Sequence, residues 1–307
     1  MPRRRDEMVP EAEFRSYYGQ PIVKKPIWHE PHMPTYLYLG GLSGAASVMA
    51  VAARLSGADR LARASQMIAF GGGAAGAGFL VAELGRPERF LNMLRVFKVT
   101  SPMSVGSWTL AAHGGLTSVG AASAVTGVLP VVGDAATLAS GVTGALMATY
   151  TAVLLADTAV PAWHEAMREL PFLFAGSATA SAGAMAMLTT PRRLAGPARA
   201  AAVTGAAVET AAGALMERRL GMLAEPYRTG RAGRLMRASR ALTVGGGLLA
   251  AVAGRSRTLT ALSAAAITAG ALCTRFGVLE AGRVSAADPK YTVVPQRDRL
   301  TARLGGR

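Results

Sequence analysis

Hydrophobic and polar positions alternate along this chain in long blocks. Eight mostly apolar stretches are separated by short breaks that are rich in arginine. A membrane-spanning helix needs about 20 such residues, and only a helix satisfies the backbone of an isolated segment inside lipid. The pattern therefore predicts eight transmembrane helices, at Tyr36–Leu55, Ser65–Leu84, Ser104–Val128, Ala135–Val160, Pro171–Thr190, Ala198–Met216, Ala238–Gly254 and Thr258–Leu279.

The breaks also divide the chain into four parts. Residues 1–34 are polar and rich in proline, which predicts an extended arm, and residues 283–307 read as an extended tail. Between them, the break at Pro161–Pro171 separates residues 35–160 from residues 161–282. We expect an all-α integral membrane protein with two four-helix bundles and both termini on the same side. Alanine and glycine dominate the spans, as is typical of closely packed membrane helices, and a soluble helical core would not need eight of them.

The basic charge points to membrane orientation. The chain has 33 Lys and Arg residues against 18 Asp and Glu, for a net charge of +15. A soluble protein with this charge would suggest nucleic acid, but here the arginines lie in the breaks between spans. About three quarters of them fall on the side of the termini, so the positive-inside rule puts both termini in the cytoplasm. A loop that docks a partner would also be basic, and that alternative stays open.

Two ionisable residues fall deep within predicted spans. His113 lies about ten residues into the third stretch and Glu209 near the middle of the sixth, which puts both close to the midplane. Such residues are candidates for a proton path. The plain alternative is a hydrogen bond to a neighbouring helix, which we prefer for His113. For Glu209 the two interpretations balance, because a buried carboxylate must be paired or protonated.

Resident redox centres are not expected in this chain. The single cysteine, Cys273, cannot hold an iron–sulfur cluster or form an internal disulfide. A b-type haem usually needs two deep histidines, and only His113 is deep. We therefore predict no haem, no iron–sulfur cluster and no metal site.

The termini-side ends of the predicted helices carry a mixture of His, Tyr, Asp, Glu and Arg at one shallow depth. A quinone site needs an apolar slot, hydrogen-bond partners for two carbonyl oxygens, and a proton carrier. An aromatic belt with basic topology signals is the ordinary alternative. The candidate binding residues are His29, His32, Tyr36, Arg86 and Tyr150, and the candidate proton carriers are Glu83, Asp157 and His164.

Several blocks of this sequence resemble the NrfD family, the membrane subunits of polysulfide-reductase type. The resemblance covers nearly the whole chain, and its specific parts follow the second span. The blocks are Tyr17–Pro21, Trp28–His29, Tyr36–Gly44, Leu84–Pro87, Ser101–Trp108, Thr149–Leu155 and Asp288–Tyr291.

The resemblance implies a fold and a set of partners. It implies about eight spans in two four-helix bundles, no bound metal, and a quinone pocket near the face where an iron–sulfur, ferredoxin-like subunit docks. That subunit would link the chain to a molybdopterin-type catalytic subunit. The matching positions are His32 and Tyr36 in the first span and Tyr150 in the fourth. The Ala- and Arg-rich composition is associated with GC-rich bacterial genomes, so menaquinone is expected ahead of ubiquinone, in a bacterial inner membrane.

Two other functions fit parts of the pattern. Two half-similar bundles with glycine-rich helices and a midplane Glu209 are compatible with a secondary transporter or a proton channel. A purely structural membrane anchor would instead tolerate substitution of the shallow polar group. The first hypothesis is a quinone-reactive membrane subunit that exchanges electrons with an iron–sulfur partner, with possible proton translocation.

Overall fold

The chain folds as an array of long helices. The computed structural model describes residues 21–84 and 86–305, and all of the regular structure within them is helical. Eight of the described helices have 20 residues or more. They are α1 (His32–Leu55), α2 (Asp59–Glu83), α3 (Pro102–Thr126), α4 (Pro130–Ala156), α6 (Leu170–Thr189), α7 (Gly196–Arg219), α9 (Gly230–Val252) and α10 (Arg257–Ala287).

Short elements connect the long helices. Proline favours the first helical turn, because its missing N–H would be unpaired there. This preference sets the starts of α3 at Pro102 and α4 at Pro130, and Gly127 ends α3 in the left-handed conformation with φ 72°. The short elements are η1 (Pro87–Leu94), α5 (Pro161–Glu165), η2 (Gly221–Ala224), α8 (Glu225–Arg228), η3 (Ala253–Arg255) and α11 (Lys290–Gly305).

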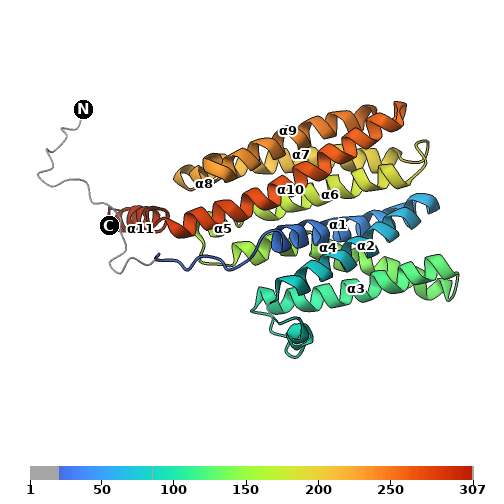
Figure 1. Cartoon of the computed structure of the whole chain (residues 1–307), viewed down its shortest axis with the longest axis horizontal. Helices are drawn as coiled ribbons and strands as arrows, with labels where there is room; N and C mark the ends of the chain where they lie inside the picture. Colours follow the sequence, from blue (N-terminus) through green and yellow to red (C-terminus); the bar gives the residue numbers. More distant parts are fainter. Residues whose placement is uncertain (1–20, 85, 306–307) are drawn as a thin grey trace, which may run out of the picture.

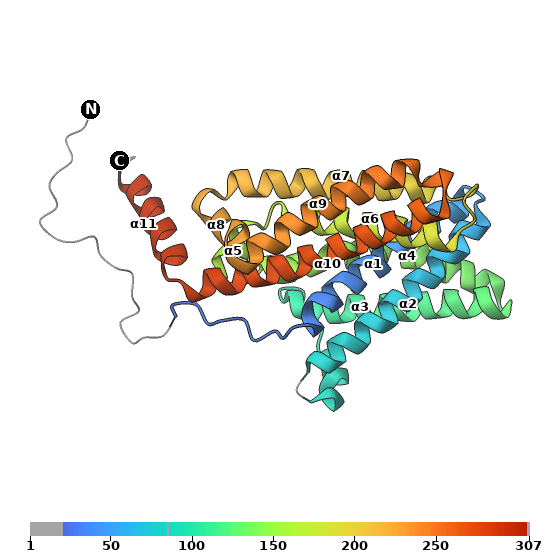
Figure 2. The same ribbon diagram turned by 45° about the horizontal axis from the view of Figure 1, so that its top comes forward.

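The long helices run side by side in two sets that meet along a central seam (Figure 1). In one set α1 packs against α2 and α4, and α3 against α4. In the other set α6 packs against α7, and α9 against α7 and α10. The sets meet where α1 contacts α6 and α10, and where α4 contacts α6. Residues 21–31 and α11 lie at the same end of the array in both views (Figures 1 and 2), and we call this the termini-side end.

Glycines allow the helices of each set to approach closely. A Cβ atom on Gly44 of α1 would lie 2.4 Å from the carbonyl oxygen of Gly144 in α4. A Cβ atom on Gly205 of α7 would lie 2.3 Å from the amide nitrogen of Ala180 in α6. Small residues at such crossings let membrane helices pack by backbone contact. This explains why the spans are rich in glycine and alanine rather than in bulky apolar residues.

Five of the described helices are long and apolar enough to cross a membrane. They are α1, α2, α4, α6 and α10. The helices α3, α7 and α9 have comparable lengths but fall outside that group. Each of the eight predicted stretches overlaps one long helix, although α1 begins at His32 and α9 at Gly230, earlier than the apolar pattern indicates.

The predicted extended tail, residues 283–307, is wrong over its described part, which is helical. The α10 helix continues to Ala287, and Asp288 and Pro289 form a break before α11. The Asp288 carboxylate accepts a hydrogen bond from the Lys290 backbone amide at 3.0 Å, which is an N-terminal cap. The pair Asp-Pro thus starts a helix here. The predicted arm is non-helical from residue 21 to the start of α1, and residues 1–20 lie outside the described part.

The α11 helix is held by contacts near its start. Tyr291 is buried, and Lys290 Nζ lies 3.1 Å from Glu225 Oε2 of α8. The hydrogen bond from Lys290 lowers the pKa of the Glu225 carboxyl. The same hydrogen bond to Glu225 raises the pKa of the Lys290 amine. Ion pairs near the surface add little stability. The main effect of this pair is to fix the position at which α11 leaves the helical array.

Candidate functional site

A mostly apolar cavity of about 340 Å³ opens among α1, α2, α3 and α4 at the termini-side end. Its volume is in the range of small-molecule sites. Most of its lining is aliphatic or aromatic, with a few polar groups that converge from different elements. The polar lining residues are His29, Tyr36, Glu83, Ser107 and Tyr150.

Glu83 is the carboxylate of this cavity and ends α2. Its side chain is 9% exposed. The Oε1 atom accepts a hydrogen bond from the His29 backbone amide at 2.7 Å and lies 3.3 Å from His29 Nδ1. The Oε2 atom is buried without a hydrogen-bond partner among the described residues, and His32 Nδ1 lies 3.7 Å from it. One oxygen is therefore fixed by the arm, and the other has no hydrogen-bond partner among the described residues.

Two tyrosines supply hydroxyl groups to the same cavity. Tyr36 of α1 is 2% exposed and Tyr150 of α4 is partly buried. Within the described part of the chain, neither hydroxyl makes a hydrogen bond. Gly106 of α3 makes room for Tyr150, because a Cβ atom there would lie 1.7 Å from Tyr150 Cζ and 1.9 Å from its hydroxyl oxygen. The Tyr150 ring thus lies directly on the α3 backbone.

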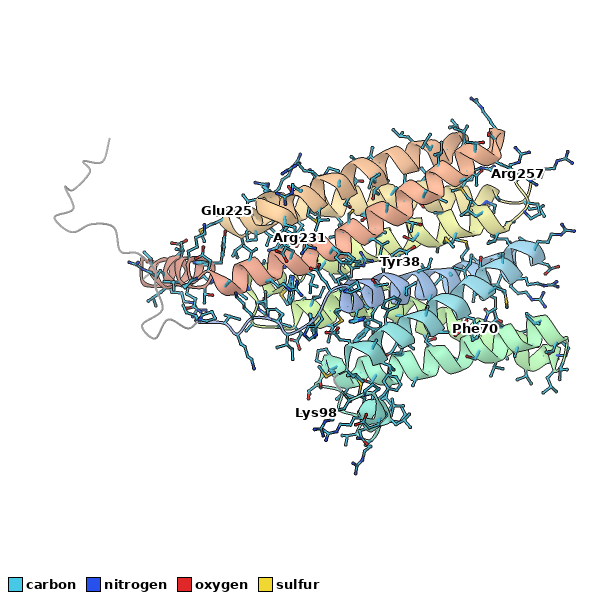
Figure 3. The ribbon with its side chains drawn as sticks, viewed as in Figure 1. Tyr38, Phe70, Lys98, Glu225, Arg231 and Arg257 are labelled. Carbon is cyan, nitrogen blue, oxygen red and sulfur yellow. The ribbon has the colours of Figure 1, made fainter. Side chains whose placement is uncertain are left out.

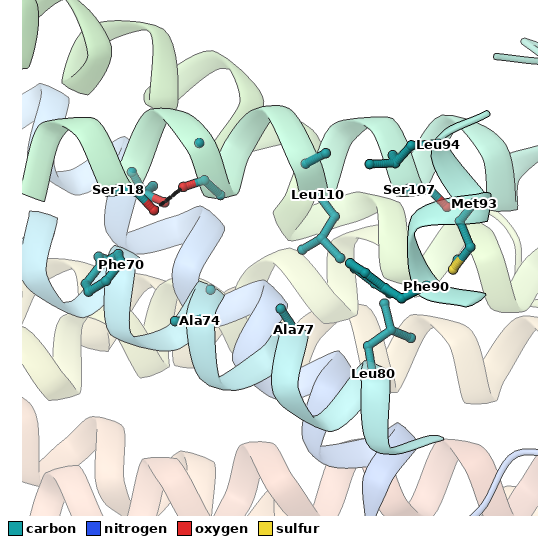
Figure 4. Close-up of a pocket in the computed structure, with 15 residues that line it drawn as sticks. Phe70, Ala74, Ala77, Leu80, Phe90, Met93, Leu94, Ser107, Leu110 and Ser118 are labelled. Atoms are coloured by element: carbon teal, nitrogen blue, oxygen red, sulfur yellow. Dashed lines mark hydrogen bonds between the residues drawn. The ribbon is translucent and has the colours of Figure 1, made fainter. Parts of the chain in front are cut away.

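A second apolar cavity of about 270 Å³ adjoins the first. It lies between α2 and α3 and shares four lining residues with the first cavity, Leu80, Met93, Ser107 and Leu110. Figure 4 shows Phe90 and Met93 of η1 beside the end of this groove, and Phe70 near its other end. The element η1 therefore closes an apolar slot that leads from the polar cavity along the two helices.

Ionic contacts hold the arm over the cavity. Glu30 accepts hydrogen bonds from Arg231 Nη2 at 2.6 Å and from Arg283 Nη1 at 2.8 Å, and Arg283 also donates to the Trp28 carbonyl. The Trp28 ring stacks on Trp163 with centroids 5.5 Å apart. Both arginines come from the second helix set, so that set positions residues that line a cavity in the first.

The structure brings some of the predicted site residues together and separates others. His29, Tyr36, Glu83 and Tyr150 line one cavity, with His32 beside it. The remaining three lie elsewhere. Arg86 is exposed before η1, Asp157 is exposed and lines a separate cavity of about 510 Å³ on another side of Tyr150, and His164 Nδ1 lies 3.1 Å from the Ala156 carbonyl oxygen.

His113 is fully buried and hydrogen-bonded at both ring nitrogens. Its Nε2 lies 2.9 Å from Ser43 Oγ, and its Nδ1 lies 3.0 Å from Thr143 Oγ1. Because the Ser43 hydroxyl donates to the Ala69 carbonyl at 2.6 Å, its oxygen accepts from the Nε2 hydrogen. Hydrogen bonding to neighbouring helices, the plain interpretation of this residue, is thus found.

Glu209 lies within a cluster of hydroxyl groups in the second helix set. It is 4% exposed, and its two oxygens accept from Thr274 at 2.6 Å and from Thr243 at 3.3 Å. Ser239 lies 2.6 Å from the Thr274 hydroxyl. A cavity of about 20 Å³ beside Glu209 extends to Arg240 near the termini-side end. Such a space holds about one water molecule.

Sequence reasoning missed two features of the site. Gly106 stands in the quoted Ser101–Trp108 block, but only the position of the Tyr150 ring reveals its role. The η1 segment falls in one of the arginine-rich breaks of the sequence pattern, although Pro87 favours a helical turn there and Phe90, Met93 and Leu94 form an apolar face.

The fold and the site define a class of protein: an array of long helices, five of them able to cross a membrane, with a small-molecule cavity at one end. A family model described as Polysulphide reductase, NrfD, matches residues 21–224, and the chain belongs to this family. Comparison with curated proteins finds no match. Membership of this family indicates a membrane subunit of a respiratory oxidoreductase complex. Members of the family generally associate with iron–sulfur and molybdopterin subunits.

Proposed function

We propose that the cavity lined by Tyr36, Glu83 and Tyr150 binds the head of a quinone, and that the chain is the quinone-reactive subunit of its complex. The observation that carries this proposal is the set of unpartnered polar atoms in an apolar slot. Two tyrosine hydroxyls and Glu83 Oε2 reach one cavity without a hydrogen-bond partner among the described residues. Buried polar groups are normally paired, so these groups are suited to a polar ligand.

The lining fits the two parts of such a ligand. A quinone head is flat and apolar with two opposed oxygens, and the hydroxyls of Tyr36 and Tyr150 donate to such oxygens. The adjoining groove between α2 and α3 is apolar and suits an isoprenoid tail. A bound quinone supplies two-electron, two-proton redox chemistry.

The residues of this chain then handle the protons. The Glu83 carboxylate accepts or returns a proton through Oε2, the oxygen that has no partner. His29, whose Nδ1 lies 3.3 Å from the other carboxylate oxygen and whose side chain is 73% exposed, exchanges that proton with water. An iron–sulfur partner subunit would supply or take up the two electrons. Asp157 and His164 lie outside the cavity and take no part in this proton path.

The partner subunit docks at the termini-side end in this proposal. The cavity opens there, and η1 and the following loop expose the large apolar residues Leu91, Val96, Phe97 and Val99. We place this end in the cytoplasm of a bacterial inner membrane, on the distribution of arginines. All eight long helices span the membrane in this proposal, as two four-helix bundles. Menaquinone is preferred to ubiquinone on composition alone.

The test compares two activities of the intact complex. Tyr150→Phe and Glu83→Gln should each lower the quinone-linked rate at limiting quinone about fivefold, because each removes one polar contact in a water-poor site. Activity of the catalytic subunit with an artificial dye should stay unchanged. Tyr38→Phe is the matched control, since Tyr38 lies on α1 but does not line the cavity. Equal loss of both activities would show that these residues do not form a quinone site. Unchanged quinone-linked activity would instead indicate that the chain is a purely structural membrane anchor.

A second role, proton exchange at Glu209, is supported by its hydroxyl cluster. Ser239, Thr274 and Glu209 are linked by short polar contacts and together line the small cavity beside the middle of α7. Glu209→Gln in sealed vesicles should then abolish any proton movement coupled to turnover while quinone-linked electron transfer persists. A solute transporter is less well supported, because the space beside Glu209 is too small for a solute. Uptake of a solute by vesicles that contain this chain alone would favour the transporter over the proton-exchange role.

A further inference from the structure

The opposite end of the helical array contains a basic cleft that the quinone proposal does not use. The cleft measures about 930 Å³ and lies among the start of α2, the end of α6, the following loop and the start of α10. Figure 3 places Arg257 at this end, far from Glu225 and Arg231. Four arginines line the cleft, Arg60, Arg192, Arg193 and Arg257.

Carboxylates do not balance this charge. The two acidic residues in the adjacent loops and first helical turns, Asp59 and Asp134, both pair with Arg54, at 2.9 Å and 2.6 Å. Among the described residues, the four cleft arginines form no ion pair. Arg192 Nη1 instead donates to the Arg255 carbonyl at 3.3 Å. An excess of guanidinium groups in a concave site attracts an anion, and guanidinium matches phosphate oxygens in geometry.

A buried hydroxyl gives a second, independent observation. Thr190, at the end of α6, lines the cleft and is 5% exposed, and its Oγ1 atom has no hydrogen-bond partner in the described structure. The neighbouring threonines are satisfied, since Thr189 donates to the Met185 carbonyl and Thr260 to the Ala253 carbonyl. A buried hydroxyl without a partner is uncommon, and this one belongs to a residue of the cleft wall.

The edges of the cleft are apolar. Leu188 and Leu194 line it and are each 48% exposed, and the neighbouring Leu262 is 53% exposed. The cleft therefore combines a phosphate-binding centre with an aliphatic border at the end of a transmembrane helix array. Guanidinium groups beside exposed aliphatic side chains suit an anionic lipid head group and its acyl chains.

We propose that this cleft binds an anionic phospholipid whose head group carries two phosphates. Four arginines can engage two phosphates in pairs, and the cleft is far larger than a single phosphate needs. The exposed leucines lie against the acyl chains. The inference is independent of the quinone proposal, because it rests on the other end of the molecule.

The experiment measures lipid retained by the purified complex, with native mass spectrometry, and thermal stability in mixed micelles. The probes are diphosphatidylglycerol, phosphatidylglycerol and inorganic phosphate. The variant replaces Arg60, Arg193 and Arg257 by glutamine. The matched control makes the same replacement at Arg63, Arg199 and Arg255, which lie at the same end but do not line the cleft. Each basic residue near an anionic lipid contributes about fivefold in affinity, so the triple variant should bind about a hundredfold more weakly.

Each result decides the proposal. Diphosphatidylglycerol should raise the melting temperature of the wild type and the control but not of the triple variant, and Thr190→Val should weaken the effect without altering the fold. A comparable loss in the control would show general attraction to a basic surface and overturn the site. Equal effects of phosphatidylglycerol or inorganic phosphate would overturn the two-phosphate lipid. Quinone-linked activity should be unchanged at saturating lipid.

Discussion

The contact between Gly106 and Tyr150 gives the sharpest test of the cavity. Gly106→Ala adds one methyl group to α3, and its Cβ atom would lie 1.7 Å from Tyr150 Cζ. Ordinary contact begins at 3.4 Å, so the ring or the helix must move by about 1.7 Å. That displacement is more than half the length of a hydrogen bond. The Tyr150 hydroxyl would then leave the position from which it reaches the cavity.

Two separate costs follow from this displacement. Overpacking of this kind destabilises a protein by about 1–3 kcal/mol. Loss of one hydrogen bond to the quinone head weakens binding by about 1 kcal/mol, which corresponds to about fivefold in KM for quinol. We therefore expect a lower melting temperature together with a raised KM. Gly78→Ala is the control, because a Cβ atom there meets nothing within 4 Å.

The assay is a double-mutant cycle on the intact complex, read by thermal unfolding and by quinone-linked rate. In a Tyr150→Ala background the obstructing ring is gone, so Gly106→Ala should add little further destabilisation. Additive effects of the two substitutions on stability would refute the packing argument. A normal KM in Gly106→Ala would show that the Tyr150 hydroxyl does not contact the ligand.

Three further outcomes are expected. Glu30→Gln removes the carboxylate that binds two arginines, so trypsin should cleave after Lys24 several times faster than in the wild type, and an unchanged rate would show that the arm is held otherwise. His113→Phe removes one hydrogen-bond partner each from the Ser43 and Thr143 hydroxyls and should cost about 1–3 kcal/mol in thermal unfolding, whereas His113→Gln should cost less. Lys290 lowers the pKa of Glu225, so the stability from this pair is present above the ordinary value of 4.5 and is lost as pH falls through the lowered pKa. Hydrogen exchange in residues 290–305, corrected for intrinsic rates, should therefore rise only below pH 4.5, and Glu225→Gln should remove that pH dependence.

The sequence predicts the helices well because apolar length is a local property. Each apolar stretch corresponds to a long helix, since about 20 apolar residues suit one conformation inside lipid. The polar ends of the helices were less predictable. The segment around Asp288 and Pro289 was interpreted as an extended tail, but a side-chain cap and a salt bridge to Glu225 make it the start of a helix. Those contacts depend on α8, which no local pattern could reveal.

The site was predictable by depth but not by direction. Tyr36, Glu83 and Tyr150 lie at the same depth in the membrane, and the boundaries of the predicted spans are enough to predict that depth. Whether Asp157 joins them depends on the rotation of the end of α4, and it lies outside the cavity. Helices composed mainly of alanine and glycine carry little amphipathic signal, so the sequence gives no face for each helix. The direction of a side chain is then set by glycine contacts such as that of Gly106.

The clamp on Glu30 has a consequence for biogenesis. Glu30 is bound by arginines that follow it by 201 and 253 residues in the chain. At a synthesis rate of about 5–20 residues per second, the second of these arginines emerges tens of seconds after the arm. The first four long helices can enter the bilayer well before that time, but their cavity has no fixed entrance until α10 arrives. A truncated or stalled chain therefore presents an unfinished pocket, which ties the closed form of the cavity to completion of the polypeptide.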